Sequence, residues 1–132
     1  MSMQMAFAAG AYRQAATTVG PLRAVVMVYD EIITSFARAD RALDGNNPEE
    51  VYRQIERATT LLRGLRSALD YRTDEGFATQ MEKVYTRLIL AMHASFGKTD
   101  ARERYGKLCL GIVELRNAWA EIGHLPPREE TN

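Results

Sequence analysis

The chain has 132 residues, of which 46% are hydrophobic, and its 17 lysine and arginine residues balance 17 aspartate and glutamate residues. This length suits one domain with its own core, and the balanced charge argues against a generally basic nucleic-acid binder. The single cysteine excludes an intrachain disulfide framework and a cysteine-cluster metal site, and no apolar run approaches the ~20 residues that span a bilayer.

The N-terminal segment, residues 1–18, is expected to cap a larger helical unit. Gln4 to Gln14 has the pattern of a short helix, and a break at Thr17–Gly20 separates it from the first long helix of that unit. A helix this short is unstable alone, so we expect it to dock or fray. The start of the chain carries no basic residues ahead of an apolar run, which makes it a poor secretory signal.

A long helix is predicted from about Pro21 to Leu43, because proline suits the first helical position and apolar residues recur at helical spacing. The cluster Asp44–Asn47 is a turn. The apolar stripe of the helix comprises Leu22, Val25, Val26, Tyr29, Ile32, Ile33 and Phe36.

The second long helix is predicted to begin at Pro48. Asn47 is placed to cap it, and Glu50 completes a box-like cap. Its apolar stripe comprises Val51, Ile55, Ala58, Leu62, Leu65 and Leu69.

The last two helices come after further turns. Thr73 or Asp74 is the expected cap of the third, and Gly97 is placed to end it. Asp100 with Glu103 starts the fourth. The third stripe comprises Phe77, Met81, Val84, Leu88, Met92 and Phe96, and the fourth comprises Tyr105, Leu108, Ile112, Leu115, Trp119 and Ile122.

Short connections make successive helices antiparallel neighbours. We therefore predict an all-α fold: one domain over residues 1–132, with an up-down-up-down four-helix bundle over residues 20–123. A short N-terminal helix or cap segment precedes the bundle. The polar tail, residues 124–132, is expected to be flexible.

Apolar residues are also found outside the stripes, which raises the question of what they contact. A slightly rotated helix would bury some of them, and single exposed apolar residues are normal. A contiguous patch would instead mark an interface, and a groove between helices suits an amphipathic partner helix. The outlying residues are Met27, Val28, Tyr52, Ile89, Leu90, Leu110 and Val113.

Few residues suggest chemistry, and we expect no enzyme, metal site or cofactor. His93 lies on a helix of the expected bundle, as in a histidine phosphotransfer domain, but the usual lysine and glycine placement after the histidine is not matched. His124 is expected to be solvated. Cys109 has no visible general base nearby in the pattern, which favours a structural thiol.

Several stretches resemble the flagellar secretion chaperone family FliS in order and spacing. The resemblance begins with Ala11-Tyr12, continues with Pro21-Leu22 and Tyr29-Asp30, and extends through Leu65–Leu88 to the closing motif Leu115–Trp119. The chain departs from the family pattern at Val19-Gly20-Pro21, where the family has serine before proline, and at His93–Ser95, where it has alanine and asparagine. These differences indicate a divergent member.

The resemblance implies a cytoplasmic chaperone that binds the disordered C-terminal segment of flagellin and keeps it unpolymerised. It also implies delivery to the flagellar type III export gate, with no nucleic acid and no stable membrane insertion. The residues expected to contact the partner are Tyr12, Leu22, Met27, Val28, Tyr29, Tyr52, Ile89, Leu90, Leu110 and Val113; Leu22 and Tyr29 are equally compatible with the core.

Two alternatives remain open. The same outlying face suits a self-associating helical scaffold or adaptor, which would stay oligomeric at low micromolar concentration without a client. A histidine phosphotransfer-like bundle is the other alternative, and stable phosphorylation of His93 would support it.

Overall fold

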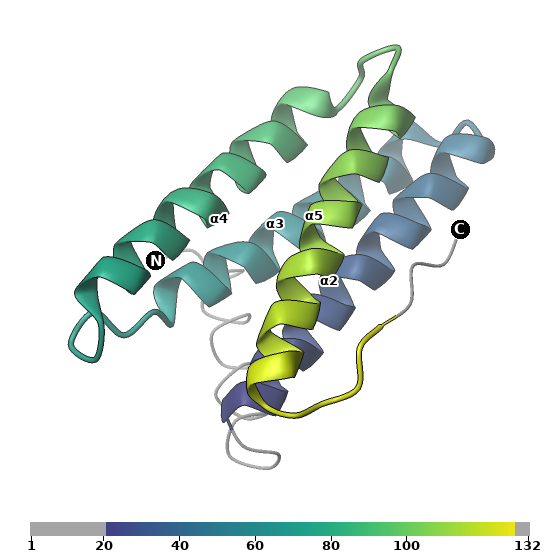
Figure 1. Cartoon of the computed structure of the whole chain (residues 1–132). Helices are drawn as coiled ribbons and strands as arrows, with labels where there is room; N and C mark the ends of the chain where they lie inside the picture. Colours follow the sequence, from purple (N-terminus) through teal and green to yellow (C-terminus); the bar gives the residue numbers. More distant parts are fainter. Residues whose placement is uncertain (1–20, 129–132) are drawn as a thin grey trace.

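A computed structural model describes residues 21–128 and shows four antiparallel helices, with no strand in that part of the chain (Figure 1). The helices are α2 (Pro21–Asp44), α3 (Pro48–Ser67), α4 (Glu75–Ser95) and α5 (Ala101–Ile122). The predicted all-α bundle is confirmed. The expected N-terminal cap segment and Tyr12 lie outside the described residues.

The helix ends follow the local sequence in most places. The side chain of Asn47 accepts a hydrogen bond from the Glu50 amide at 3.2 Å, and Pro48 occupies the first helical position of α3. Asp74 caps α4 by accepting from the Phe77 amide at 3.0 Å. Gly97 follows α4 with φ of 77°, a left-handed conformation that favours glycine.

Two predicted caps differ in detail. The Glu50 carboxylate accepts from Gln54 at 2.8 Å and pairs with Arg53 at 3.0 Å, so it is engaged along its own helix. Asp100 precedes α5 but makes no side-chain cap bond. Its carboxylate accepts from Arg104 Nε at 2.7 Å instead, because a residue one turn along the helix offers a charged donor.

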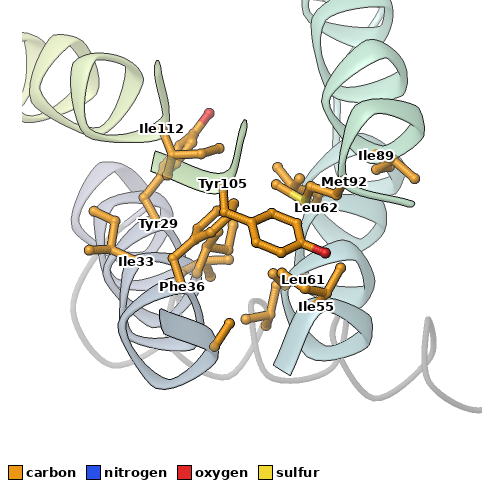
Figure 2. Close-up of a cluster of buried hydrophobic side chains, with 14 of the residues drawn as sticks. Tyr29, Ile33, Phe36, Ile55, Leu61, Leu62, Ile89, Met92, Tyr105 and Ile112 are labelled. Carbon is orange, nitrogen blue, oxygen red and sulfur yellow. The ribbon is translucent and has the colours of Figure 1, made fainter. Parts of the chain in front are cut away.

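The core receives side chains from all four helices, and α2 packs most extensively, against α3 and α5 (Figure 2). Tyr29 and Phe36 of α2 meet Tyr105 and Ile112 of α5 there, and Leu62 of α3 joins them. α4 packs less extensively, against α3 and α5. Burial of this apolar surface stabilises the bundle. Because α2 packs most extensively against its neighbours, it is the central helix.

The predicted stripe of α4 is confirmed at Met81 and Met92, which are buried in the core, and is wrong at its two ends. Phe77 and Phe96 are exposed, whereas Tyr85 and Ile89 are buried. The face that α4 presents to the core runs through Ala78, Met81, Tyr85, Ile89 and Met92. The sequence offers apolar residues on both faces of this helix, so only packing against α3 and α5 selects one.

Candidate functional site

An apolar pocket of about 410 Å³ opens at the end of the bundle where α2 and α4 begin and α3 and α5 end. We call it the end pocket. Antiparallel packing brings these four helix termini together, and the α3–α4 loop completes the wall. The lining comprises Leu22, Val25, Leu65, Ala68, Leu69, Asp70, Thr73, Asp74, Phe77, Ala78, Tyr85 and Trp119.

Two aromatic side chains shape one wall of the end pocket. The rings of Phe77 and Trp119 meet edge to face, with centroids 5.8 Å apart and planes at 71°. Phe77 retains 46% of its exposure, whereas Trp119 packs against the core cluster. The pocket therefore offers an aromatic surface that water contacts and that an apolar side chain of a partner would cover.

Beside the pocket, a buried pair of tyrosines joins two helices across the bundle. The hydroxyls of Tyr29 and Tyr85 lie 2.6 Å apart. Burial, together with the neighbouring Tyr85, raises the pKa of Tyr29 far above its ordinary value, while a hydrogen bond from Trp119 opposes the shift. The Tyr29 hydroxyl therefore stays protonated at neutral pH, so the pair is structural and Tyr29 supplies no general base.

The rim of the end pocket is acidic, but its carboxylates are already used by the loop. Asp70 accepts from the Thr73 hydroxyl at 2.8 Å and from the Arg72 amide at 2.9 Å. These two hydrogen bonds lower the pKa of Asp70, so it is ionised at neutral pH. With Asp74 capping α4, the rim holds two carboxylates that shape the entrance.

The structure separates the residues that the sequence suggested for partner binding. Leu22 is half-buried and lines the end pocket. Met27, Tyr52, Leu90 and Leu110 are exposed, one on each helix.

Four of the suggested residues are buried instead, namely Val28, Tyr29, Ile89 and Val113. All four belong to the core cluster, so the expectation that Val28, Ile89 and Val113 lie off the core is wrong. Each of the bundle helices contacts two neighbours, and the core face is therefore wider than one stripe.

The end pocket also contains residues that the sequence reasoning assigned to the core alone. Phe77, Leu69 and Trp119 were expected to be stripe residues, yet they form the pocket wall. The available signal was their position: all three lie within about two turns of a helix end that a short loop brings to the same end of the bundle. A second exposed aromatic pair, Tyr52 and Phe96, stacks edge to face at 5.5 Å at the opposite end.

The surroundings of His93 and Cys109, which the sequence offered for other chemistry, do not favour a catalytic role. His93 Nε2 lies 3.1 Å from a guanidinium nitrogen of Arg63, and because arginine only donates, Nε2 accepts. Burial raises the pKa of the Cys109 thiol, which disfavours a reactive thiolate. Among residues 21–128 no group of three or more histidine, cysteine and acidic side chains could hold a metal ion.

A membrane-crossing helix is not found either: none of the helices in the described part of the chain is both long enough and apolar enough.

Comparison with protein families gives a match over most of the chain. Residues 3–126 match the family described as "Flagellar protein FliS", which covers all four helices. A search of curated proteins finds no match for the chain.

Proposed function

The chain belongs to the FliS family of flagellar proteins, and from this membership we propose that it is a cytoplasmic export chaperone that binds the disordered C-terminal region of flagellin. The family implies the role of a flagellin export chaperone and is not enzymatic. In the proposed function, the chain keeps its client from polymerising too early and assists its delivery to the flagellar type III export apparatus.

The family match over residues 3–126 is the observation that carries this proposal. The open apolar surface supports it physically. A filament subunit segment that packs with its own copies needs temporary apolar cover before assembly, and the end pocket and the exposed aromatic residues offer such cover. Coupled folding and binding of a disordered segment typically buries on the order of 1,000–3,000 Å².

We place the client contacts at the end pocket and at those apolar positions suggested by the sequence that remain accessible on the closed bundle. Of the residues suggested by the sequence, these are Leu22, Met27, Tyr52, Leu90 and Leu110. Phe77 and Trp119 of the end pocket join them. The buried residues Val28, Tyr29, Ile89 and Val113 would support this surface from behind, because a client reaches them only if the bundle opens.

The domain division is part of the proposal. Residues 20–123 form the client-binding bundle, and residues 1–18 act as a cap that competes with the client. Deletion of residues 1–15 is expected to raise client affinity, and unchanged affinity would remove the competing role of the cap while leaving the chaperone function intact.

The decisive experiment is titration of the purified chain with a peptide that represents the flagellin C-terminal region. We expect a 1:1 complex. Phe77→Ala is expected to weaken binding about tenfold, since an aromatic anchor in a pocket contributes about 1–2 kcal/mol or more. Ile122→Ala is the matched control: this apolar side chain is also exposed and near the same end, but it does not line the end pocket.

Two results would count against the chaperone function. One is absence of binding to the flagellin segment by the unmodified chain. The other is a client-free oligomer that persists at low micromolar concentration and that Phe77→Ala dissociates, because this would assign the same surface to self-association.

A further inference from the structure

The residues after α5 form a strap, residues 124–128, which returns along the bundle (Figure 1). His124 adopts a positive φ of 56° and reverses the chain, and the Leu125 amide donates to the Ala120 carbonyl at 2.7 Å. We expected a flexible tail from His124 onward, and that prediction did not include these hydrogen bonds. Residues 129–132 lie outside the described part of the chain.

The strap is held through its backbone by two neighbouring side chains of α5. The Asn117 carboxamide accepts from the Arg128 amide at 2.8 Å and donates to the Arg128 carbonyl at 3.1 Å. Arg116 donates to the Pro126 carbonyl at 2.7 Å and to Asn117 Oδ1 at 3.2 Å, which fixes the orientation of the carboxamide. Contacts of this kind recognise an extended backbone, whatever its side chains.

One side chain of the strap is recognised by charge. The Asp30 carboxylate of α2 accepts from the Arg128 guanidinium at 2.9 Å and from Arg116 Nε at 3.0 Å. Arg116 is only 12% exposed, and its ion pair with Asp30 joins α5 to α2, two helices that pack against each other without the strap. We therefore expect release of the strap to leave Asp30 and Arg116 in place, with the Asn117 carboxamide free to bind another backbone.

We propose that Asp30, Arg116 and Asn117 form a receptor for an extended peptide segment with a basic side chain, and that residues 125–128 occupy it as an intramolecular ligand. A partner segment of the same chemistry displaces the strap. The two prolines of the strap suit this site because they lack backbone N–H groups and favour extended backbone. The three receptor residues do not line the end pocket. The proposal of this receptor is therefore independent of the proposal that the chain binds flagellin.

The test uses the full chain and a fluorescent peptide with the sequence of residues 124–132. A tethered ligand has an effective concentration of about millimolar with a short linker, so the unmodified chain is expected to bind the free peptide weakly. Arg128→Ala removes the basic side chain of the strap but keeps the receptor. This variant is expected to bind the peptide at least about tenfold more tightly than the unmodified chain.

Two controls assign the binding to the receptor. Asn117→Ala added to Arg128→Ala is expected to return peptide binding to the level of the unmodified chain. The same peptide with alanine in place of its arginine is expected to bind at least about tenfold more weakly, since it loses the charge-assisted bond to Asp30. Equal peptide binding by the unmodified chain and Arg128→Ala would overturn the proposal, and so would binding that survives Asn117→Ala.

Amide hydrogen exchange tests the strap in the unmodified chain, so the result does not depend on how a substitution affects folding. The Arg128 amide is expected to exchange at least about tenfold more slowly than in the free peptide, because Asn117 accepts its hydrogen bond. Exchange at the rate of the free peptide would show that the strap is not held and would refute the proposal by itself.

Discussion

Three tyrosines are buried at the centre of the bundle, and their hydroxyls differ in hydrogen bonding. Those of Tyr29 and Tyr85 bond to each other, while the Tyr105 hydroxyl is buried without a hydrogen-bond partner. In Figure 2 the Tyr105 ring extends from α5 toward Leu61 and Ile55. An unpartnered buried hydroxyl costs free energy, whereas a partnered one stabilises modestly.

Replacement of single tyrosines by phenylalanine should therefore have opposite effects. Tyr105→Phe is expected to raise the free energy of unfolding by about 1 kcal/mol, because it removes an unsatisfied group. Tyr85→Phe is expected to lower it by about 1 kcal/mol, because Tyr29 loses a hydroxyl partner. Urea denaturation of the two variants and the parent measures both changes, and a destabilising effect of Tyr105→Phe would contradict the assignment.

Tyr105 also predicts a dependence of stability on alkaline pH. Burial raises its pKa to about 12, whereas the unfolded value is about 10. The unfolded chain therefore loses this proton first, so the hydroxyl adds no pH dependence below about pH 10, and the free energy of unfolding falls as the pH rises from about 10 toward 12. Thermal unfolding between pH 9 and 12 should show a shallower decline in Tyr105→Phe than in the parent.

At the scale of the elements, the helix caps decide where chain segments turn, but not every predicted cap forms. Asn47 and Asp74 make side-chain bonds to the first turns of α3 and α4, while Asp100 binds Arg104 instead. A capping side chain satisfies a backbone amide that would otherwise lack a partner. The sequence places suitable residues at all three positions, and local geometry selects which of them bond.

This difference predicts unequal effects of cap removal. Asp74→Ala is expected to destabilise the protein by about 1 kcal/mol, and Asp100→Ala by about half of that or less. Chemical denaturation followed by far-ultraviolet circular dichroism compares the two variants. Equal losses would indicate that Asp100 caps α5 in solution.

For the whole molecule, the distribution of packing makes α2 the most protected helix and α4 the least. α2 lies between α3 and α5, whereas α4 packs less extensively against its two neighbours. Opening of part of a protein costs least where few buried contacts are lost. We therefore expect α4, which carries Phe77 at the end pocket, to open most readily.

Hydrogen exchange and two leucine variants test this picture. Amides of α4 are expected to exchange faster than those of α2. Leu62→Ala, at a site of 0% exposure, should cost about 2–5 kcal/mol, whereas Leu90→Ala, at 64% exposure, should change stability by less than about 0.5 kcal/mol. A large loss at Leu90 would mean that this side chain is covered in solution, by a second copy or by another segment of the chain.

Helical periodicity and turn chemistry are local properties, so the sequence by itself determined the number of long helices, their order and most of their ends. The motifs from Pro21-Leu22 to Leu115–Trp119 likewise identified the family, because their order is a property of the chain alone. The buried face of α4 was determined only in part, at Met81 and Met92, since both of its faces carry apolar residues and only contact with α3 and α5 adds Tyr85 and Ile89 to the core. The end pocket and the strap were also decided by tertiary structure, because each joins residues that are distant in the chain and that meet only when the helices pack.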